Sequence, residues 1–198
     1  MSGGALIVFL KNPDSENVKT RLAKDTGREL ARKVYEKLIK HTLDESFSSE
    51  AKVHLFFSGG IPEDKKFGDA AFFTQTGEHL GERMKNAFQD VFNRGFKKAV
   101  IIGSDCPEIS GGHINQALSV LDIADVVIGP ADDGGYYLLG MKTLHHALFE
   151  NKNWSTDSVL TDTIADFRAL GLNYVQLPAM TDIDTIEDYH KFPDFQVS

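Results

Sequence analysis

The sequence GPADDGGYYL at residues 129–138 decides the fold class, together with GSDCP at residues 103–107. Each stretch follows a run of β-branched residues, 100–102 and 126–128, that stops at a small residue and opens into acidic groups. Strands that end in this way deliver carboxylates to the carboxyl edge of a parallel sheet, where open α/β folds bind their ligands. The pattern therefore predicts a functional site at that edge.

Strand-like and helix-like segments alternate along the chain, which predicts an α/β fold with a mostly parallel central sheet covered on both faces. No repeat or low-complexity linker divides the chain, so we expect one domain over residues 1–198. A capping-box-like sequence at 26–29 predicts the start of the first helix, in which Leu30, Val34 and Leu38 recur at helical spacing. We expect strands at 5–10, 52–57, 98–102, 125–128, 136–140 and 174–177, and further helices around 84–91, 114–121, 158–170 and 182–189.

Composition excludes several classes of protein. The 29 acidic and 21 basic residues give a net charge of −8, so the chain has no general attraction to nucleic acid or anionic lipid. Its apolar runs are strand-sized, far short of the roughly 20 residues that span a bilayer. The single cysteine excludes an internal disulfide, and the N-terminus lacks a secretory pattern, so we expect a cytoplasmic protein.

Acidic residues at two strand ends are candidate metal ligands. Asp105 directly follows a buried strand, and a carboxylate in that place suits Mg²⁺ or Mn²⁺; its alternative role is a turn or helix cap. Asp182 and Asp184 lie on the same side of an extended chain, so one or both could join Asp105 around a cation. Their alternative role is capping the terminal helix, with Thr185 and Asp188 as other capping residues.

Three basic residues, Lys11, Lys19 and Arg21, follow the first strand of an otherwise acidic chain. Such a cluster is expected where a diphosphate or triphosphate is held, although scattered surface residues would also explain it. The DDGG turn at 132–135 either brings backbone and carboxylates to a ligand or is an acidic surface turn. Trp154 is equally suited to stacking on a ligand and to covering the core.

Six ordered motifs spanning nearly the whole chain, residues 8–188, resemble a known family. They are LKNP at 10–13 leading to VKTRLA at 18–23, GERM at 81–84, GSDCP at 103–107, GPADDGGYY at 129–137, WSTD at 154–157 and DIDTIED at 182–188. Together they resemble the glycosyltransferase-like family found beside radical-SAM genes and linked to arsenosugar biosynthesis. That family is similar to small members of the nucleotide-diphospho-sugar transferase superfamily with a GT-A fold, a Rossmann-like three-layer sandwich.

The resemblance implies roles for particular residues. Lys11, Lys19 and Arg21 match the basic nucleotide-binding loop, and Asp105 matches the aspartate that binds the metal, Mg²⁺ or Mn²⁺, and through it the nucleotide. Asp184 falls where related enzymes place a second metal ligand, with Asp182 as its rival. The DDGG turn falls on the sugar or acceptor side of the site, where we expect the substrate-binding residues Gly134, Gly135, Tyr136, Trp154, Ser155 and Thr156. We expect Asp133 or Asp132 to orient or deprotonate the acceptor.

The implied activity is a metal-dependent transfer of a sugar from a nucleotide-sugar donor to a small-molecule acceptor. One alternative is a nucleotidyltransferase resembling phospholactate guanylyltransferases, with a nucleoside triphosphate donor, and another is a non-catalytic nucleotide-binding protein. The latter is suggested by Ser15-Glu16, which stands where the family usually has Pro-Gly and would bring a carboxylate toward phosphate. The sequence is also compatible with a homodimer.

Overall fold

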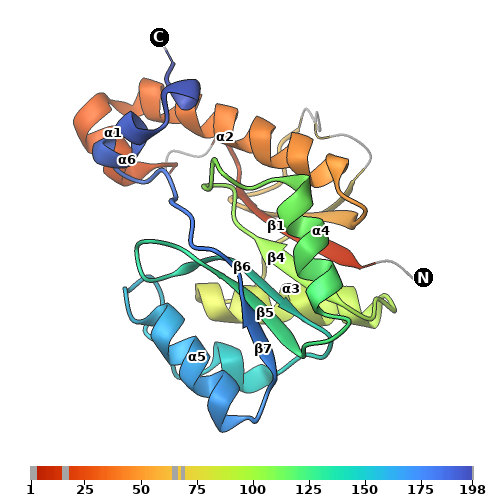
Figure 1. Ribbon diagram of the computed structural model, residues 1–198. Coiled ribbons are helices and arrows are strands. Elements are labelled where there is room, and N and C mark those ends of the chain that lie inside the picture. Colours follow the sequence, from red (N-terminus) through yellow and green to blue (C-terminus); the bar gives the residue numbers. More distant parts are fainter. Residues whose placement is uncertain (1–3, 15–17, 64–66, 68–69, 198) are drawn as a thin grey trace.

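One seven-stranded sheet organises the chain in the computed structural model, which describes residues 4–14, 18–63, 67 and 70–197 (Figure 1). The strands are β1 (Ala5–Lys11), β2 (Lys52–Ser58), β3 (Ala71–Thr74), β4 (Ala99–Ile102), β5 (Val126–Pro130), β6 (Tyr136–Met141) and β7 (Tyr174–Gln176). Their order across the sheet is β3-β2-β1-β4-β6-β5-β7. β1 therefore lies inside the sheet, and its neighbours β2 and β4 bring segments far apart in sequence to its two sides.

All strand pairings are parallel except those of β6, which runs antiparallel to both β4 and β5. The short turn at 131–135 connects β5 to β6, and a connection of that length cannot make the crossover that a parallel pair requires. The reversal places this turn at the same edge of the sheet as the carboxyl end of β4. The expected mostly parallel α/β sheet is thus confirmed.

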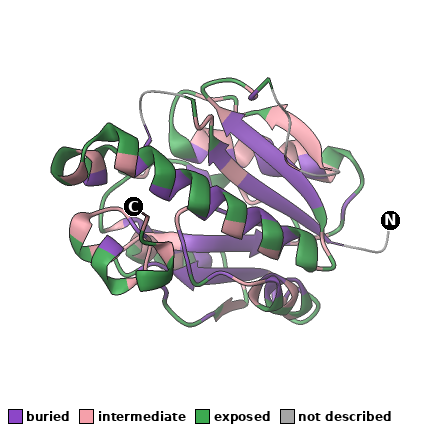
Figure 2. Ribbon diagram, turned by 90° about the horizontal axis from the view of Figure 1, so that it is seen from above, coloured by how far each residue is buried: buried purple, intermediate pink, exposed green. Residues whose placement is uncertain are grey.

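Helices cover both faces of the sheet, in three layers (Figures 1 and 2). Adjacent residues of β1 show the division: Val8 packs in a cluster with Tyr35, and Ile7 packs in another with Phe88. α2 and α4 cover the first face, whereas α3, η1 and α5 cover the second. The helices are α1 (Thr20–Thr26), α2 (Arg28–Ser48), α3 (Leu80–Asn93), α4 (Gly111–Val120), α5 (Val159–Ala169) and α6 (Ile186–Lys191), with 3-10 turns η1 (His146–Phe149) and η2 (Pro193–Phe195).

A third apolar cluster joins α1, α2 and α6, elements from opposite ends of the chain. Leu22 of α1 and Ile183, just before α6, are both fully buried in it. Because these residues pack together, the acidic stretch around Ile183 is held against the N-terminus of α1. This packing assembles part of the site described below.

Two local expectations were wrong. Thr26 does not cap the first long helix: it ends α1, its hydroxyl donates to the Leu22 carbonyl, and Gly27 precedes α2 without a side-chain cap. The basic stretch after β1 is also partly helical, since α1 begins at Thr20. A capping box does form before α6, where Thr185 and Asp188 bond reciprocally to each other's backbone N–H.

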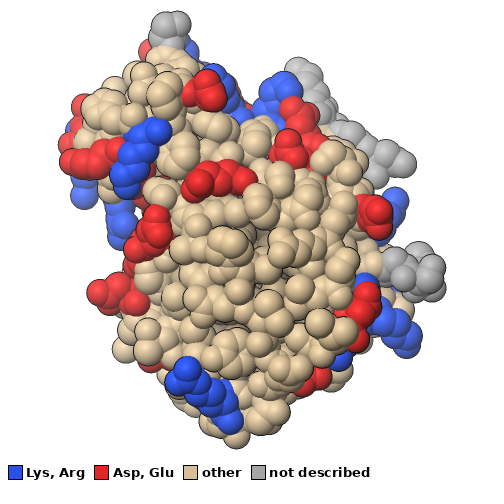
Figure 3. Space-filling model, in the orientation of Figure 1, with Lys and Arg blue, Asp and Glu red and all other residues tan. Residues whose placement is uncertain are grey.

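Figure 3 shows acidic and basic side chains interspersed around one face of the molecule, whose centre over β5 and β7 is formed largely by uncharged residues. This face therefore presents no continuous basic band for a polyanion. Among the described residues, no helix combines the length and apolarity needed to cross a membrane.

Candidate active site

A cleft of about 790 Å³ opens at the carboxyl edge of the sheet. β1 and β4 are parallel neighbours, with Val8 opposite Ile102, so the chain leaves both strands at this edge. The predicted location of the site thus coincides with a cavity. The charged residues lining the cleft are Lys11, Lys19, Arg21, Arg83, Asp105, Asp133, Asp157, Asp182 and Asp184.

Lys19 forms an ion pair with each of two carboxylates in the cleft. Its Nζ lies 2.6 Å from Asp105 Oδ1 and 3.1 Å from Asp184 Oδ1, and it donates to the Ile183 carbonyl at 2.6 Å. Burial alone would lower the pKa of the Lys19 ammonium, but Asp105 and Asp184 outweigh that effect and raise the pKa above its ordinary value. Lys19 is therefore a charged, buried link between the end of β4 and the segment before α6.

Asp182 has the most perturbed carboxyl group of the cleft. Burial, reinforced by the negative charge of Asp105, raises the pKa of Asp182 to about 8; Lys19 opposes the rise, while Asp184 and Asp133 add to it. At neutral pH the Asp182 carboxyl therefore mostly holds its proton. A cation bound among these carboxylates would favour its ionised form.

The three carboxylates Asp105, Asp182 and Asp184 offer the oxygen ligands that Mg²⁺ and Mn²⁺ prefer. Within the described ranges, however, no three His, Cys, Asp or Glu side chains are grouped as a complete metal site. Mg²⁺ commonly takes one or two carboxylates from a protein and completes its shell with water and substrate phosphate. The donors present fit a metal that binds together with a phosphate-bearing ligand.

The Tyr35 hydroxyl joins the carboxyl ends of β1 and β4. It accepts a hydrogen bond from Lys11 N at 2.7 Å and lies 3.3 Å from Ser104 Oγ. Burial and the nearby Asp105 raise the pKa of Tyr35 to about 12, so the hydroxyl stays protonated. Sequence analysis did not identify this contact, because Tyr35 follows the helical core pattern and nothing local indicates its polar partners.

The DDGG turn contributes to the cleft unevenly. Asp133 lines the cleft and accepts from Gly135 N at 2.9 Å, a bond that shapes the turn. Asp132 is not among the lining residues, and its carboxylate accepts a hydrogen bond from Thr181 Oγ1 at 2.6 Å. Gly134 also does not line the cleft, whereas Gly135 and Tyr136 do.

Trp154 borders the cleft and also packs against α3. A Cβ on Gly81 would lie 2.2 Å from the Trp154 indole, so the absence of a side chain there allows the close contact. Trp154 Nε1 is buried and has no hydrogen-bond partner among the residues that the structure describes. Ser155 follows with a φ of +66°, a conformation uncommon outside glycine, and Thr156 also lines the cleft. In this position Trp154 both covers part of the core and faces the cleft, so the two roles expected from the sequence are compatible.

The cleft includes residues that sequence analysis did not single out as site candidates. Gln75 donates through Nε2 to the carbonyls of Leu10 and Phe56, and Arg83 donates through Nε to the Gly77 carbonyl. Both line the cleft. Arg83 lies in the GERM motif. The motif drew attention to this position, but nothing in it predicted that the Arg83 side chain would line the cleft.

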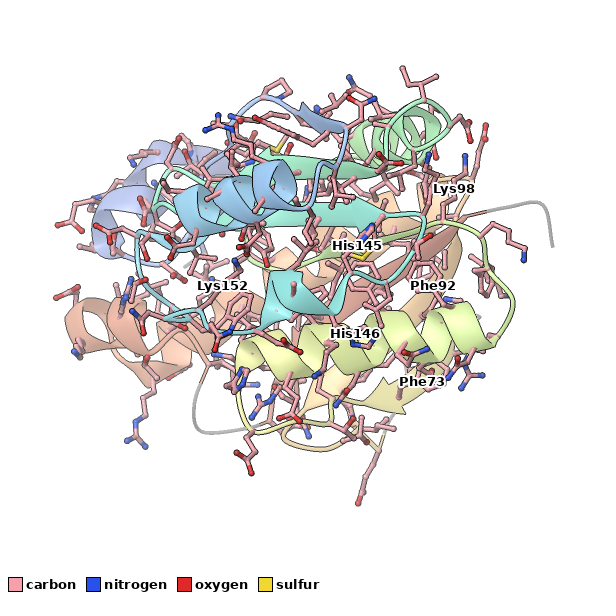
Figure 4. All side chains as sticks on the ribbon, turned by 90° about the horizontal axis from the view of Figure 1, so that it is seen from below. Phe73, Phe92, Lys98, His145, His146 and Lys152 are labelled. Atoms are coloured by element: carbon pink, nitrogen blue, oxygen red, sulfur yellow. The ribbon has the colours of Figure 1, made fainter. Side chains whose placement is uncertain are left out.

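The histidines of the segment after β6 lie elsewhere. His145 precedes η1 and His146 begins it, where Figure 4 labels both, and neither lines the cleft. Lys152, also labelled there, is buried and paired with Asp166. Cys106 lines the cleft but is 4% exposed, and burial raises the pKa of its thiol to about 12, which disfavours a nucleophilic thiolate.

The chain has the α/β fold of nucleotide-diphospho-sugar transferases, with its sheet order, its reversed β6 and an acidic cleft at the sheet edge. Comparison with solved structures confirms this fold class. The model of the family "Uncharacterized protein conserved in bacteria (DUF2064)" matches residues 43–156, and the chain belongs to this family. No protein with a curated function matches the chain by sequence.

Three solved structures illustrate the similarity. A protein from Desulfovibrio desulfuricans G20, provisionally assigned as a nucleotide-diphospho-sugar transferase, is 31% identical, with a TM-score of 0.92, and the match covers 100% of this chain and 90% of that one. A nucleotidyl transferase from Methanothermobacter is 14% identical, with a TM-score of 0.69 and coverage of 97% and 96%. Rv0371c from Mycobacterium tuberculosis H37Rv, in complex with manganese, is 14% identical, with a TM-score of 0.59 and coverage of 98% and 99%. The last two show the fold alone.

Proposed function

We propose that this protein is a metal-dependent transferase that uses a nucleotide-activated donor, and specifically a glycosyltransferase that moves a sugar from a nucleoside-diphosphate sugar to a small acceptor. One observation carries the proposal: four basic and five acidic side chains from distant segments share the cleft at the carboxyl edge of the sheet. The relative from Desulfovibrio desulfuricans G20 supports the sugar-transfer assignment. The narrower assignment to the arsenosugar-type branch rests on the sequence motifs.

The basic residues of the cleft provide contacts for the donor's phosphates. Arg21 is exposed at the cleft, and Lys11 lies at the end of β1. A guanidinium binds phosphate oxygens through paired N–H groups, which fixes orientation as well as charge. Trp154, Ser155, Thr156 and the Gly135–Tyr136 segment then form the part of the cleft that receives the sugar or acceptor.

The carboxylates divide into two proposed roles. Asp105 would hold Mg²⁺ or Mn²⁺, with Asp184 or Asp182 as second ligand, and the metal would supply positive charge beside the leaving nucleotide. Asp133, carried on the turn between β5 and β6, orients or deprotonates the acceptor hydroxyl. Asp105 and the basic residues thus act on the donor, whereas Asp133 acts on the acceptor.

A second candidate is a nucleotidyltransferase, in which a substrate phosphate attacks the α-phosphate of a nucleoside triphosphate. The fold shared with the Methanothermobacter nucleotidyl transferase favours it. Pyrophosphate release distinguishes this reaction from sugar transfer. The third hypothesis, a non-catalytic binding protein, rests on Ser15-Glu16, which lies outside the described residues.

A thermal-shift screen tests the proposal. Nucleoside triphosphates and nucleotide sugars are compared with and without Mn²⁺; a ligand present at 100 times its dissociation constant stabilises the fold by about 2.7 kcal/mol. Ligands that stabilise are then incubated with candidate acceptors, and products are separated by chromatography. Sugar transfer releases nucleoside diphosphate, and nucleotidyl transfer releases pyrophosphate. If no nucleotide stabilises the protein under either condition, the proposed function is wrong.

A further inference from the structure

Lys19 has an unusual backbone conformation at the entrance to α1. Its φ and ψ are both 47°, in the left-handed region, and its carbonyl accepts from Ala23 N at 2.8 Å as the helix begins. A non-glycine residue in this region costs free energy unless surrounding contacts compensate. Here the compensating contacts are those of the side chain, which is 3% exposed.

The ammonium of Lys19 has no donor left for another ligand. It has three N–H groups, and three oxygens lie around it: Asp105 Oδ1 at 2.6 Å, Ile183 O at 2.6 Å and Asp184 Oδ1 at 3.1 Å. The two carboxylates remain 42% and 40% exposed, so they can be reached from the cleft. The arrangement is a cation site that the protein fills with its own side chain.

A divalent ion that bridged Asp105 Oδ1 and Asp184 Oδ1 would compete with the ammonium for the same two oxygens. Mg²⁺ binds carboxylate oxygens at about 2.0–2.1 Å, so such an ion would lie too close to Nζ for both cations to remain. We propose that Lys19 is a positioning residue that occupies the metal position of the free protein, and that a divalent ion must displace it to bridge the two carboxylates. This inference rests on the metal role given to these residues in the proposed function.

Displacement has a consequence for the donor. A buried ammonium that loses its carboxylates needs another anion, because an unpaired buried charge is costly. The phosphate of a donor entering the same cleft supplies one. Lys19 then couples the two binding events: it weakens metal binding in the free protein and contacts phosphate once the metal is in place.

Titrating the free protein with Mn²⁺ alone tests the displacement. Binding is measured by calorimetry and by the electron paramagnetic resonance signal of unbound Mn²⁺. Lys19→Met removes the charge and keeps the length, so it is expected to bind Mn²⁺ at least about tenfold more tightly, since no charge-assisted contacts have to be broken. Lys24→Met, an exposed position on α1, controls for the change in net charge. Lys19→Arg keeps the charge and is expected to retain the weak affinity. Equal or weaker Mn²⁺ binding by Lys19→Met overturns the proposal.

A measurement on the unmodified protein covers the case in which Lys19→Met fails to fold. Burial and its three oxygen partners are expected to slow exchange of the Lys19 ammonium protons enough to give a signal in a ¹H–¹⁵N spectrum. This signal, assigned by its absence in Lys19→Arg, is expected to shift and broaden as Mg²⁺ is added. A signal that stays unchanged while Mg²⁺ binds contradicts displacement. Neither experiment uses a nucleotide, so an absence of nucleotide binding would overturn the proposed function and leave this result standing.

Discussion

Asp132 and Asp133 are neighbours in sequence, yet they face different surroundings. Asp132 is held by the Thr181 hydroxyl, and only Asp133 lines the cleft. Consecutive residues in a turn commonly diverge in this way, and the sequence left both as candidates for the acceptor. The geometry favours Asp133 for that role.

The exchange Asp133→Asn tests this assignment. The amide oxygen can still accept from Gly135 N, so the turn is expected to persist and nucleotide-sugar affinity to remain within a few-fold of wild type. Transfer is expected to fall by at least about 10²-fold, the lower end of a general base contribution. The same exchange at Asp132 is expected to have the smaller effect. Calorimetry and product assays measure the two quantities; a parallel loss of both in Asp133→Asn would instead make the turn part of the donor pocket.

At the scale of single residues, the sequence predicted which kinds of side chain line the cleft better than it predicted their contacts. The acidic and basic candidates Lys11, Lys19, Arg21 and Asp105 do line one cleft, because strand ends and residue chemistry can be recognised locally. That the Lys19 ammonium bonds to carboxylates rather than standing free could not be foreseen, since its partner Asp184 is 165 positions away in the sequence.

At the scale of elements, the turn between β5 and β6 is positioned by the first turn of α5 and the segment just before it. Leu160 N donates to the Gly134 carbonyl at 2.9 Å, and a Cβ on Gly134 would lie 2.3 Å from the Asp157 carbonyl oxygen. The turn and this segment are therefore in direct backbone contact. Together they form one wall of the cleft.

Two glycine substitutions separate this packing from backbone strain. Gly134 and Gly95 have φ values of +87° and +93°, but a Cβ on Gly95 would meet no atom of the described residues within 4 Å. Gly95→Ala thus reports the conformational cost alone. Gly134→Ala is expected to lower the free energy of unfolding by about 1–3 kcal/mol more, the usual cost of overpacking. Denaturant unfolding of both variants provides the comparison, and equal losses would show that the turn is not packed as described.

Sequence periodicity located most elements but missed those fixed by distant contacts. Six strands were expected close to their observed positions. β3 was not, because a four-residue edge strand has too short a pattern to recognise and is defined by its pairing with β2. α1 was missed for a similar reason: Leu22 is its one buried residue, and it packs with Ile183 and Tyr189 from the other end of the chain.

At the scale of the whole molecule, one buried histidine links stability to pH. His54 of β2 is 4% exposed, stacks on Phe73 and packs edge-on against Phe96. Burial lowers the pKa of His54; the Lys52 carbonyl and Asp90 oppose this, and the charges of Arg94 and Lys52 add to it. The folded protein therefore holds this imidazole neutral at a pH where the unfolded chain begins to protonate it.

The sign of the effect follows from linkage. Well above a pH of about 6.5, the ordinary histidine pKa, His54 is neutral in both states and contributes no pH dependence. As pH falls below that value, the unfolded chain binds the proton first, so the folded state loses relative stability. His54→Phe, which keeps an aromatic ring against Phe73, is expected to lose less stability between neutral and mildly acid pH than wild type. Urea unfolding across that pH range gives both slopes, and identical slopes would contradict the account.

The central claim is that the edge cleft binds a nucleotide together with a divalent metal held by Asp105. Calorimetric titration of nucleoside diphosphates, with Mn²⁺ and with chelator, into wild type and Asp105→Asn tests it most directly. The exchange keeps the side chain's shape and removes its charge, and Asp122→Asn, an exposed position, is the matched control. Wild type and control are expected to bind nucleotide more tightly with Mn²⁺, whereas Asp105→Asn should bind equally with and without it. A metal dependence that survives in Asp105→Asn would contradict the claim.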